Sequence, residues 1–148
     1  MRIMAVDYGD VRTGIAVSDI TASLVGDAWV LSVPTQQELA AVISTEALTR
    51  EVGTIVIGYP RNMDGTVGSR AEKSEYFSQI LRDELDSLVP PPDRNIEIKL
   101  WDERLTTMSA HRILNDTGRY GKKRKKLIDA VAASLILEGF LLSNNALP

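Results

Sequence analysis

The chain has 148 residues, of which 44% are hydrophobic and 25% are charged, as expected of one globular domain. It contains no cysteine, which excludes disulfides, thiolate zinc sites, iron–sulfur clusters and a cysteine nucleophile. A metal ion would need oxygen ligands or the single histidine, His111. The N-terminus lacks the apolar core of a signal peptide, and no segment reaches the roughly 18 apolar residues of a membrane span. We therefore expect a cytoplasmic protein without a membrane anchor.

The charge is unevenly distributed. The formal net charge is −3, from 17 Lys and Arg against 20 Asp and Glu, which argues against a general nucleic-acid coat. Six cations and no acid lie between Arg119 and Lys126, so this run carries +6 and the remainder −9. The run is Arg119, Lys122, Lys123, Arg124, Lys125 and Lys126. We expect a loop that meets a polyanion, although a solvated lysine-rich turn explains the run equally well.

The first third of the chain predicts an antiparallel meander. Residues 2–7 and 13–19 are short apolar runs on either side of a turn that contains glycine, which is typical of a β-hairpin. Residues 28–33 extend the meander as a third strand, which Pro34 ends.

A helix and a buried strand follow. Thr35 and Glu38 have capping-box spacing ahead of an apolar-periodic stretch, which predicts a helix to about Val52. Residues 54–58 (TIVIG) form a continuous apolar, β-branched run, as in a strand of a parallel sheet that is buried on both faces.

The remaining elements alternate in the same way. Ser69 and Glu72 repeat the capping-box spacing and predict a helix to about Leu88. Residues 96–101 (IEIKLW) alternate in polarity and predict a fifth strand. Residues 106–116 predict a short helix, and residues 127–142 a largely apolar core helix that follows the basic run. The order predicts a single α/β domain over residues 1–148, built on a mixed five-stranded sheet with flanking helices.

Three acidic residues lie where they can carry chemistry. Asp7 closes the first strand, Glu103 lies just past the fifth, and Asp129 falls in the first turn of the predicted last helix. Side chains at the carboxyl ends of parallel strands line the ligand crevice of an open α/β sheet. Clustered carboxylates suit Mg²⁺ or Mn²⁺, and a pair of such ions promotes phosphodiester hydrolysis. Each acid also has a structural explanation: for Asp7 a turn beside Gly9, for Glu103 an ion pair with the adjacent Arg104, and for Asp129 the helix dipole.

Four segments in order resemble the YqgF family, which has an RNase H-like fold and is described as pre-16S rRNA nucleases or as Holliday-junction resolvases. The segments are residues 7–19 (DYGDVRTGIAVSD), 58–66 (GYPRNMDGT), 102–107 (DERLTT) and 123–129 (KRKKLID). The resemblance covers essentially the whole chain. It implies that Asp7, Glu103 and Asp129 bind two catalytic Mg²⁺ or Mn²⁺ ions.

The resemblance also implies residues that face the substrate. Gly9 and Gly14 would let the backbone approach a phosphate, or would serve the hairpin alone. Asn62, Asp64 and Gly65 would form a substrate-facing loop, or an ordinary turn. The substrate-binding set that we expect is Gly9, Arg12, Asn62, Asp64, Arg104, Lys122, Lys123, Arg124, Lys125 and Lys126. Trp29 and Trp101 are expected in the core, and His111 is expected to be structural.

The preferred function is a metal-dependent nuclease acting on structured nucleic acid, with maturation of the 5′ end of precursor 16S rRNA favoured over four-way DNA junctions. Junction resolution would favour a homodimer, because the junction has two symmetric strands. Two alternatives come from other classes. One is a catalytically idle nucleic-acid or ribosome-binding module. The other is a kinase or ATPase of the actin and sugar-kinase kind, which needs two such domains where this chain has room for one.

Overall fold

The computed structural model describes residues 1–60, 64–102 and 121–145, and describes side chains of the last helix from residue 130 to residue 143. The elements are β1 (Arg2–Asp7), β2 (Thr13–Ser18), β3 (Val25–Leu31), α1 (Gln36–Thr49), β4 (Val52–Tyr59), α2 (Ser69–Leu88), β5 (Glu97–Asp102) and α4 (Gly121–Asn145). The sheet order is β3-β2-β1-β4-β5. β1 and β3 pair antiparallel with β2, whereas β1, β4 and β5 run parallel, which confirms the predicted mixed five-stranded sheet.

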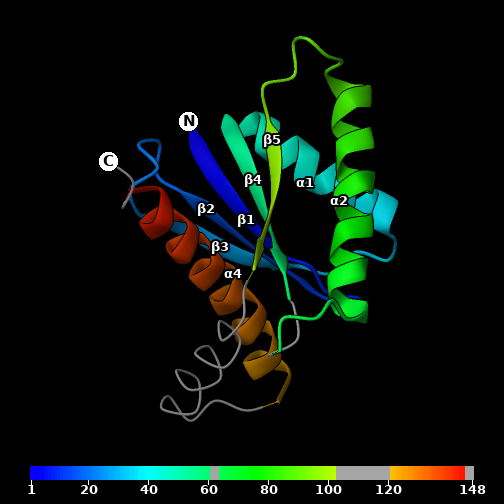
Figure 1. Cartoon of the computed structure of the whole chain (residues 1–148), viewed down its shortest axis with the longest axis vertical. Coiled ribbons are helices and arrows are strands. Elements are labelled where there is room, and N and C mark those ends of the chain that lie inside the picture. Colours follow the sequence, from blue (N-terminus) through cyan, green and yellow to red (C-terminus); the bar gives the residue numbers. More distant parts are fainter. Residues whose placement is uncertain (61–63, 103–120, 146–148) are drawn as a thin grey trace.

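Helices cover both faces of this sheet, in three layers (Figure 1). α1 and α2 pack on one face and α4 alone packs on the other. The side chains of β1 alternate accordingly: Met4 and Val6 point toward α1 and α2, and Ile3 and Ala5 toward α4. All four are buried, so β1 is the centre of both apolar cores.

The helix α1 begins as its sequence predicts. The Thr35 hydroxyl accepts a hydrogen bond from the backbone N–H of Glu38, at 3.1 Å. The helix ends earlier than expected, at Thr49, because Val52 is already the first residue of β4, where it is buried in the core beside α1.

The predicted bounds of α2 are confirmed, but its predicted cap is wrong. Gly68 occupies the N-cap position in an extended conformation and makes no side-chain capping bond, so Ser69 lies inside the first turn. Further along, Phe77, Leu81 and Leu85 are fully buried at helical spacing.

The third strand begins earlier than the predicted residues 28–33. β3 starts at Val25, which pairs with Ser18, because the Asp19 carboxylate closes a tight connection between the two strands. That carboxylate accepts hydrogen bonds from the Thr21 hydroxyl and from the backbone N–H groups of Ser23 and Leu24.

The last helix starts six residues earlier than predicted, at Gly121 in place of residue 127. Residues 122–126 of the basic run are therefore helical and not part of a loop, which agrees with the high helix propensity of lysine and arginine. Asp129 consequently lies in the third turn of α4 and not in the first. The predicted helix over residues 106–116 falls outside the described residues, as does His111.

The two tryptophans lie at the margins of the cores, half-buried where full burial was expected. The Arg50 guanidinium lies 4.5 Å from the centre of the Trp29 ring, and Trp101 meets Phe140 edge-on with ring centroids 5.5 Å apart. None of the helices in the described ranges has an apolar stretch long enough to span a bilayer.

Replacing Phe77 with alanine should destabilise the protein by about 3–5 kcal/mol, because it removes a fully buried aromatic side chain and leaves a cavity. Denaturant unfolding measures the change. The neighbouring Tyr76 is 64% exposed, so Tyr76→Ala should alter the free energy of unfolding by no more than about 0.5 kcal/mol. Equal effects of the two substitutions would contradict the packing of α2 described above.

The hydrogen bonds from Thr21, Leu24 and Ser23 lower the pKa of Asp19 from 3.8 to about 2. Because the folded-state pKa is depressed, this carboxylate stabilises the fold above about pH 4, and the contribution is lost as the pH falls toward 2. An NMR titration should show the low pKa, and Asp19→Asn should flatten the stability profile over that pH range. An Asp19 pKa near 3.8 would refute the bonded turn.

Candidate functional site

The candidate site lies at the end of the sheet where β1, β4 and β5 finish. We call this end the carboxyl end. The three strands stop there at Asp7, Tyr59 and Asp102. The three strands are parallel and adjacent in the order β1-β4-β5, so all three stop on one side of the molecule (Figure 1). Neighbouring strands lie about 4.8 Å apart, so the backbones of β1 and β5 are separated by roughly 10 Å. β1 and β5 thus end on the same side of the sheet with one strand between them, and the convergence of Asp7 with Glu103 stays a prediction.

Asp7 is the member of the predicted acidic triad that the structure describes in full. Its residue is only 9% exposed, and it pairs across the hairpin with Gly14 of β2. Since successive residues of a strand point to opposite faces, Asp7 shares the face of Ile3 and Ala5, the face that α4 covers. A buried carboxylate thus lies at the carboxyl end of the central strand, beneath α4.

The helix α4 begins at the same end of the sheet (Figure 1). Position 129 lies one helical turn before Ala133, which is buried against the sheet in the same core as Ala5. The backbone therefore brings Asp129 toward the end where Asp7 lies. Residues 122–126 occupy the first two turns of α4, so the basic run also begins at the carboxyl end.

The turn after β1 needs a glycine. A Cβ atom on Gly9 would lie 2.2 Å from the carbonyl oxygen of Arg12, a separation that no side chain tolerates without a shift of the backbone. Arg12 is half-buried in the same turn. Gly14, by contrast, lies inside β2 and not in the turn itself.

Both helices of the opposite face hold the β1–β2 turn, through contacts that the sequence did not predict. The Tyr8 ring stacks on Phe77 of α2 with centroids 4.6 Å apart, and its hydroxyl accepts a hydrogen bond from Gln36 of α1 at 2.8 Å. Asp10 forms an ion pair with Lys73 of α2 at 2.9 Å. These contacts immobilise the residues that flank Asp7.

The predicted substrate-facing loop after β4 shows the geometry of an ordinary turn at its described positions. The Asp64 carboxylate accepts hydrogen bonds from the hydroxyl of Thr66 at 2.7 Å and from its backbone N–H at 3.0 Å. These bonds lower the pKa of Asp64, and Gly65 adopts a φ of 88°, a conformation that favours glycine. Asp64 is exposed, so its contact with substrate remains a prediction.

Several predicted site residues lie outside the described residues: Asn62, Glu103 and Arg104. The side chains of Asp129 and of residues 122–126 are likewise not described, although their helix is. Among the side chains that are described, no three carboxylate or imidazole groups gather as a metal site would require. Two of the three predicted ligands lie outside that set.

Comparisons with known proteins agree with this architecture. Among curated proteins, one from Halothermothrix orenii is 42% identical over 99% of both chains, and one from Desulfitobacterium hafniense is 40% identical over 95% of this chain and 92% of its own; both carry the name "Putative pre-16S rRNA nuclease". Among solved structures, the fowlpox virus resolvase with Holliday-junction DNA has a TM-score of 0.58, covering 97% of this chain and 99% of that one. RuvC of T. thermophilus with a Holliday-junction substrate has a TM-score of 0.52, covering 99% and 96%. Both structures are 13% identical in sequence, so they establish the RNase H-like fold of resolvases and not the reaction.

The profile of the RuvX family, described as a Holliday junction resolvase family, matches residues 1–143. This match confirms the resemblance to the YqgF family that the four sequence motifs carried. Together with 42% identity to a relative over nearly the full length of both chains, it shows that the chain belongs to the RuvX family.

Proposed function

We propose that the chain is a divalent-metal-dependent nuclease that hydrolyses phosphodiester bonds in structured nucleic acid, and that it matures the 5′ end of precursor 16S rRNA in the cytoplasm. The observation that carries the proposal is the buried Asp7 carboxylate at the carboxyl end of the central strand, beneath the helix that contributes Asp129. The names of the full-length relatives support the reaction and favour the ribosomal substrate.

The donor set fits the metal. Asp7, Glu103 and Asp129 offer only carboxylate oxygens, which suit Mg²⁺ or Mn²⁺. Asp7 is buried at the carboxyl end of β1, where its carboxylate oxygens are ligands of the type that such a cation takes. When bound, a pair of such ions activates water and stabilises the attacking and leaving oxygens of an in-line displacement.

The other residues of the site position the substrate. The close turn at Gly9 brings backbone to the carboxyl end beside Asp7, and its anchoring by Tyr8 and Asp10 holds that turn in place before substrate binds. Arg12 lies in the same turn, and we assign it, together with Arg104, to contacts with backbone phosphates, because a guanidinium donates to two phosphate oxygens at once.

The basic start of α4 supports a role in binding a polyanion. Cations are unfavourable near a helix N-terminus, because the positive end of the helix dipole repels them. Five cations in the first two turns therefore work against the stability of α4. A phosphate backbone at this helix start would satisfy both the cations and the dipole.

A second candidate, resolution of four-way DNA junctions, is favoured by the description of the family and by the two fold relatives solved with junction DNA. A resolvase would act as a two-fold dimer, since it cuts two symmetric strands. The kinase alternative loses its support, because the whole chain is accounted for by one nuclease-like family.

Cleavage of two labelled substrates side by side tests the proposal: a precursor 16S rRNA 5′-end fragment and a mobile four-way DNA junction, each with Mg²⁺, with Mn²⁺ and with chelator. We expect metal-dependent cutting of the rRNA fragment, and loss of cutting with retained binding in Asp7→Asn, because the amide no longer provides an anionic metal ligand. Asp27→Asn, an exposed carboxylate on β3, is the matched control and should cut normally. Preferential cutting of the junction would favour the resolvase, and tight binding without products would favour the binding module.

Replacing Lys122, Lys123, Lys125 and Lys126 with alanine should weaken substrate binding and flatten its dependence on salt. Each phosphate contact that is lost in a duplex region should remove up to about 0.9 from the slope of log affinity against log salt concentration. Binding titrations over a series of salt concentrations measure the slope. Alanine favours helix, so α4 should remain folded, which circular dichroism checks. A slope equal to that of the parent protein would show that the basic run does not contact the phosphates of the substrate.

A further inference from the structure

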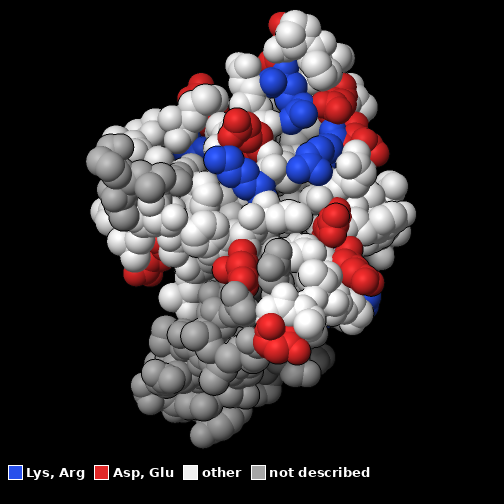
Figure 2. Space-filling model, viewed as in Figure 1, with Lys and Arg blue, Asp and Glu red and all other residues white. Residues whose placement is uncertain are grey.

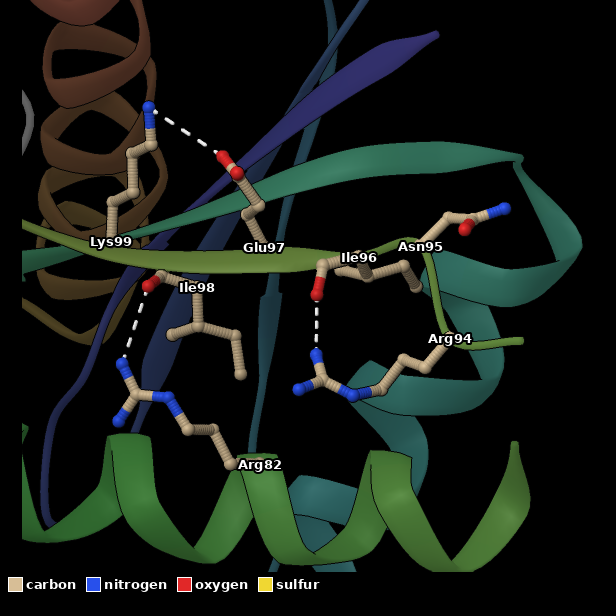
Figure 3. A pocket seen from close by; sticks show the side chains of 7 residues that line it. All are labelled: Arg82, Arg94, Asn95, Ile96, Glu97, Ile98 and Lys99. Atoms are coloured by element: carbon tan, nitrogen blue, oxygen red, sulfur yellow. Dashed lines mark hydrogen bonds and ion pairs between the residues drawn. The ribbon is translucent and has the colours of Figure 1, made fainter. Parts of the chain in front are cut away.

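A hollow of about 580 Å³ runs along the outer edge of β5, away from the carboxyl end. Arg82 of α2, Arg94 of the connection before β5, and Lys99 and Glu97 of β5 contribute its charged lining (Figure 3). Figure 2 shows the basic side chains gathered on this face of a chain whose net charge is −3. The function described above assigns no role to this surface.

The two arginines are fixed in place by the backbone of β5. β5 is an edge strand, and Arg82 donates a hydrogen bond to the carbonyl oxygen of Ile98 at 3.3 Å, while Arg94 donates to that of Ile96. A guanidinium has five N–H donors, so Arg82 retains most of its donors for another acceptor. No carboxylate among the described residues forms an ion pair with Arg82, whereas Arg94 also binds Asp86.

Lys99 completes the cationic surface from the other side of the strand. It extends toward α4, with its ammonium 5.7 Å from the centre of the Phe140 ring, while Arg82 approaches β5 from α2 (Figure 3). Its ion pair with Glu97 is long, at 3.6 Å, and both side chains are at least half exposed, so the pair is worth little. A stronger anionic partner would therefore displace Glu97 at small cost.

The chemistry of the hollow fits a phosphate backbone and not a nucleobase. Among the described residues, its lining holds two arginines, a lysine, an asparagine, a glutamate and two isoleucines, but no aromatic side chain on which a base would stack. Contacts of this kind position a nucleic acid without reading its sequence.

The hollow also lies at a suitable distance from the carboxyl end. Lys99 and Asp102 are three positions apart on β5, which is about 10 Å at the rise of a strand.

We propose that the β5 hollow binds the phosphate backbone of the nucleic-acid substrate about 10 Å along β5 from the carboxyl end, with Arg82 and Lys99 donating to different phosphates on the two sides of the strand. The proposal rests on the nuclease function above. It adds a second anchoring point, which fixes the direction in which a helical flank leaves the carboxyl end along β5.

Equilibrium binding of the labelled rRNA fragment to protein that carries Asp7→Asn tests the hollow without cleavage. Lys99→Gln and Arg82→Gln should each weaken binding several-fold and lower the salt slope by up to about 0.9. Glu97→Gln should tighten binding, because it removes the only carboxylate that the described residues contribute to the lining of the hollow. Thermal unfolding confirms that each variant is folded.

Matched controls lie at the opposite edge of the sheet. Arg50→Gln and Asp27→Asn make the same changes of charge beside β3 and should leave affinity and slope unchanged. Unchanged binding in Lys99→Gln, Arg82→Gln and Glu97→Gln would overturn the proposal, even if the protein with Asp7 intact cuts the fragment. Conversely, weakened binding without any cutting by that protein would keep the hollow and refute the nuclease.

Discussion

The parallel pairing of β1 with β4, and of β4 with β5, is the constraint on which the rest of the structure depends. It sends three strand ends to one side of the molecule, and it leaves β1 in the middle of the sheet with both of its faces covered. Apolar side chains fill the buried positions of β1 until the strand reaches Asp7. The Asp7 carboxylate is therefore held by the same packing that stabilises the core. The position of this site residue thus depends on the most tightly packed part of the fold.

The two faces of the sheet serve this site differently. On one face, α1 and α2 fix the β1–β2 turn through Tyr8 and through the ion pair of Asp10 with Lys73. On the other face, α4 packs closely over Ala5 and Ala16, whose small side chains leave room for a helix to approach the strands. The helices on one face thus position the turn beside Asp7. On the other face packs the helix α4, which contains Asp129 and the basic run.

Local sequence signals predicted much of the fold. They failed where contacts between residues far apart in the sequence determine the structure. The Thr35 cap was predictable because Thr35 and Glu38 lie within four residues of each other, and the short apolar runs on either side of a turn located β1 and β2. The start of α4 was misplaced because two glycines and a run of like charges are also typical of a loop. The contacts of Tyr8 with Gln36 and Phe77 join residues 28 and 69 positions apart, so no spacing rule reaches them. Asp7 was selected as a candidate because it ends a strand, and the same rule selected Glu103.

The arginines along β5 have a consequence for the protein before and after it folds. An edge strand with free carbonyl groups is a template for pairing with another chain, and β5 carries Ile98, Leu100 and Trp101 within six residues. By occupying the carbonyls of Ile96 and Ile98, Arg94 and Arg82 close part of that template to intermolecular strand addition. The contact from Arg82 forms only once α2 has docked on the sheet, so this part of the edge is open to strand addition in the interval before that docking.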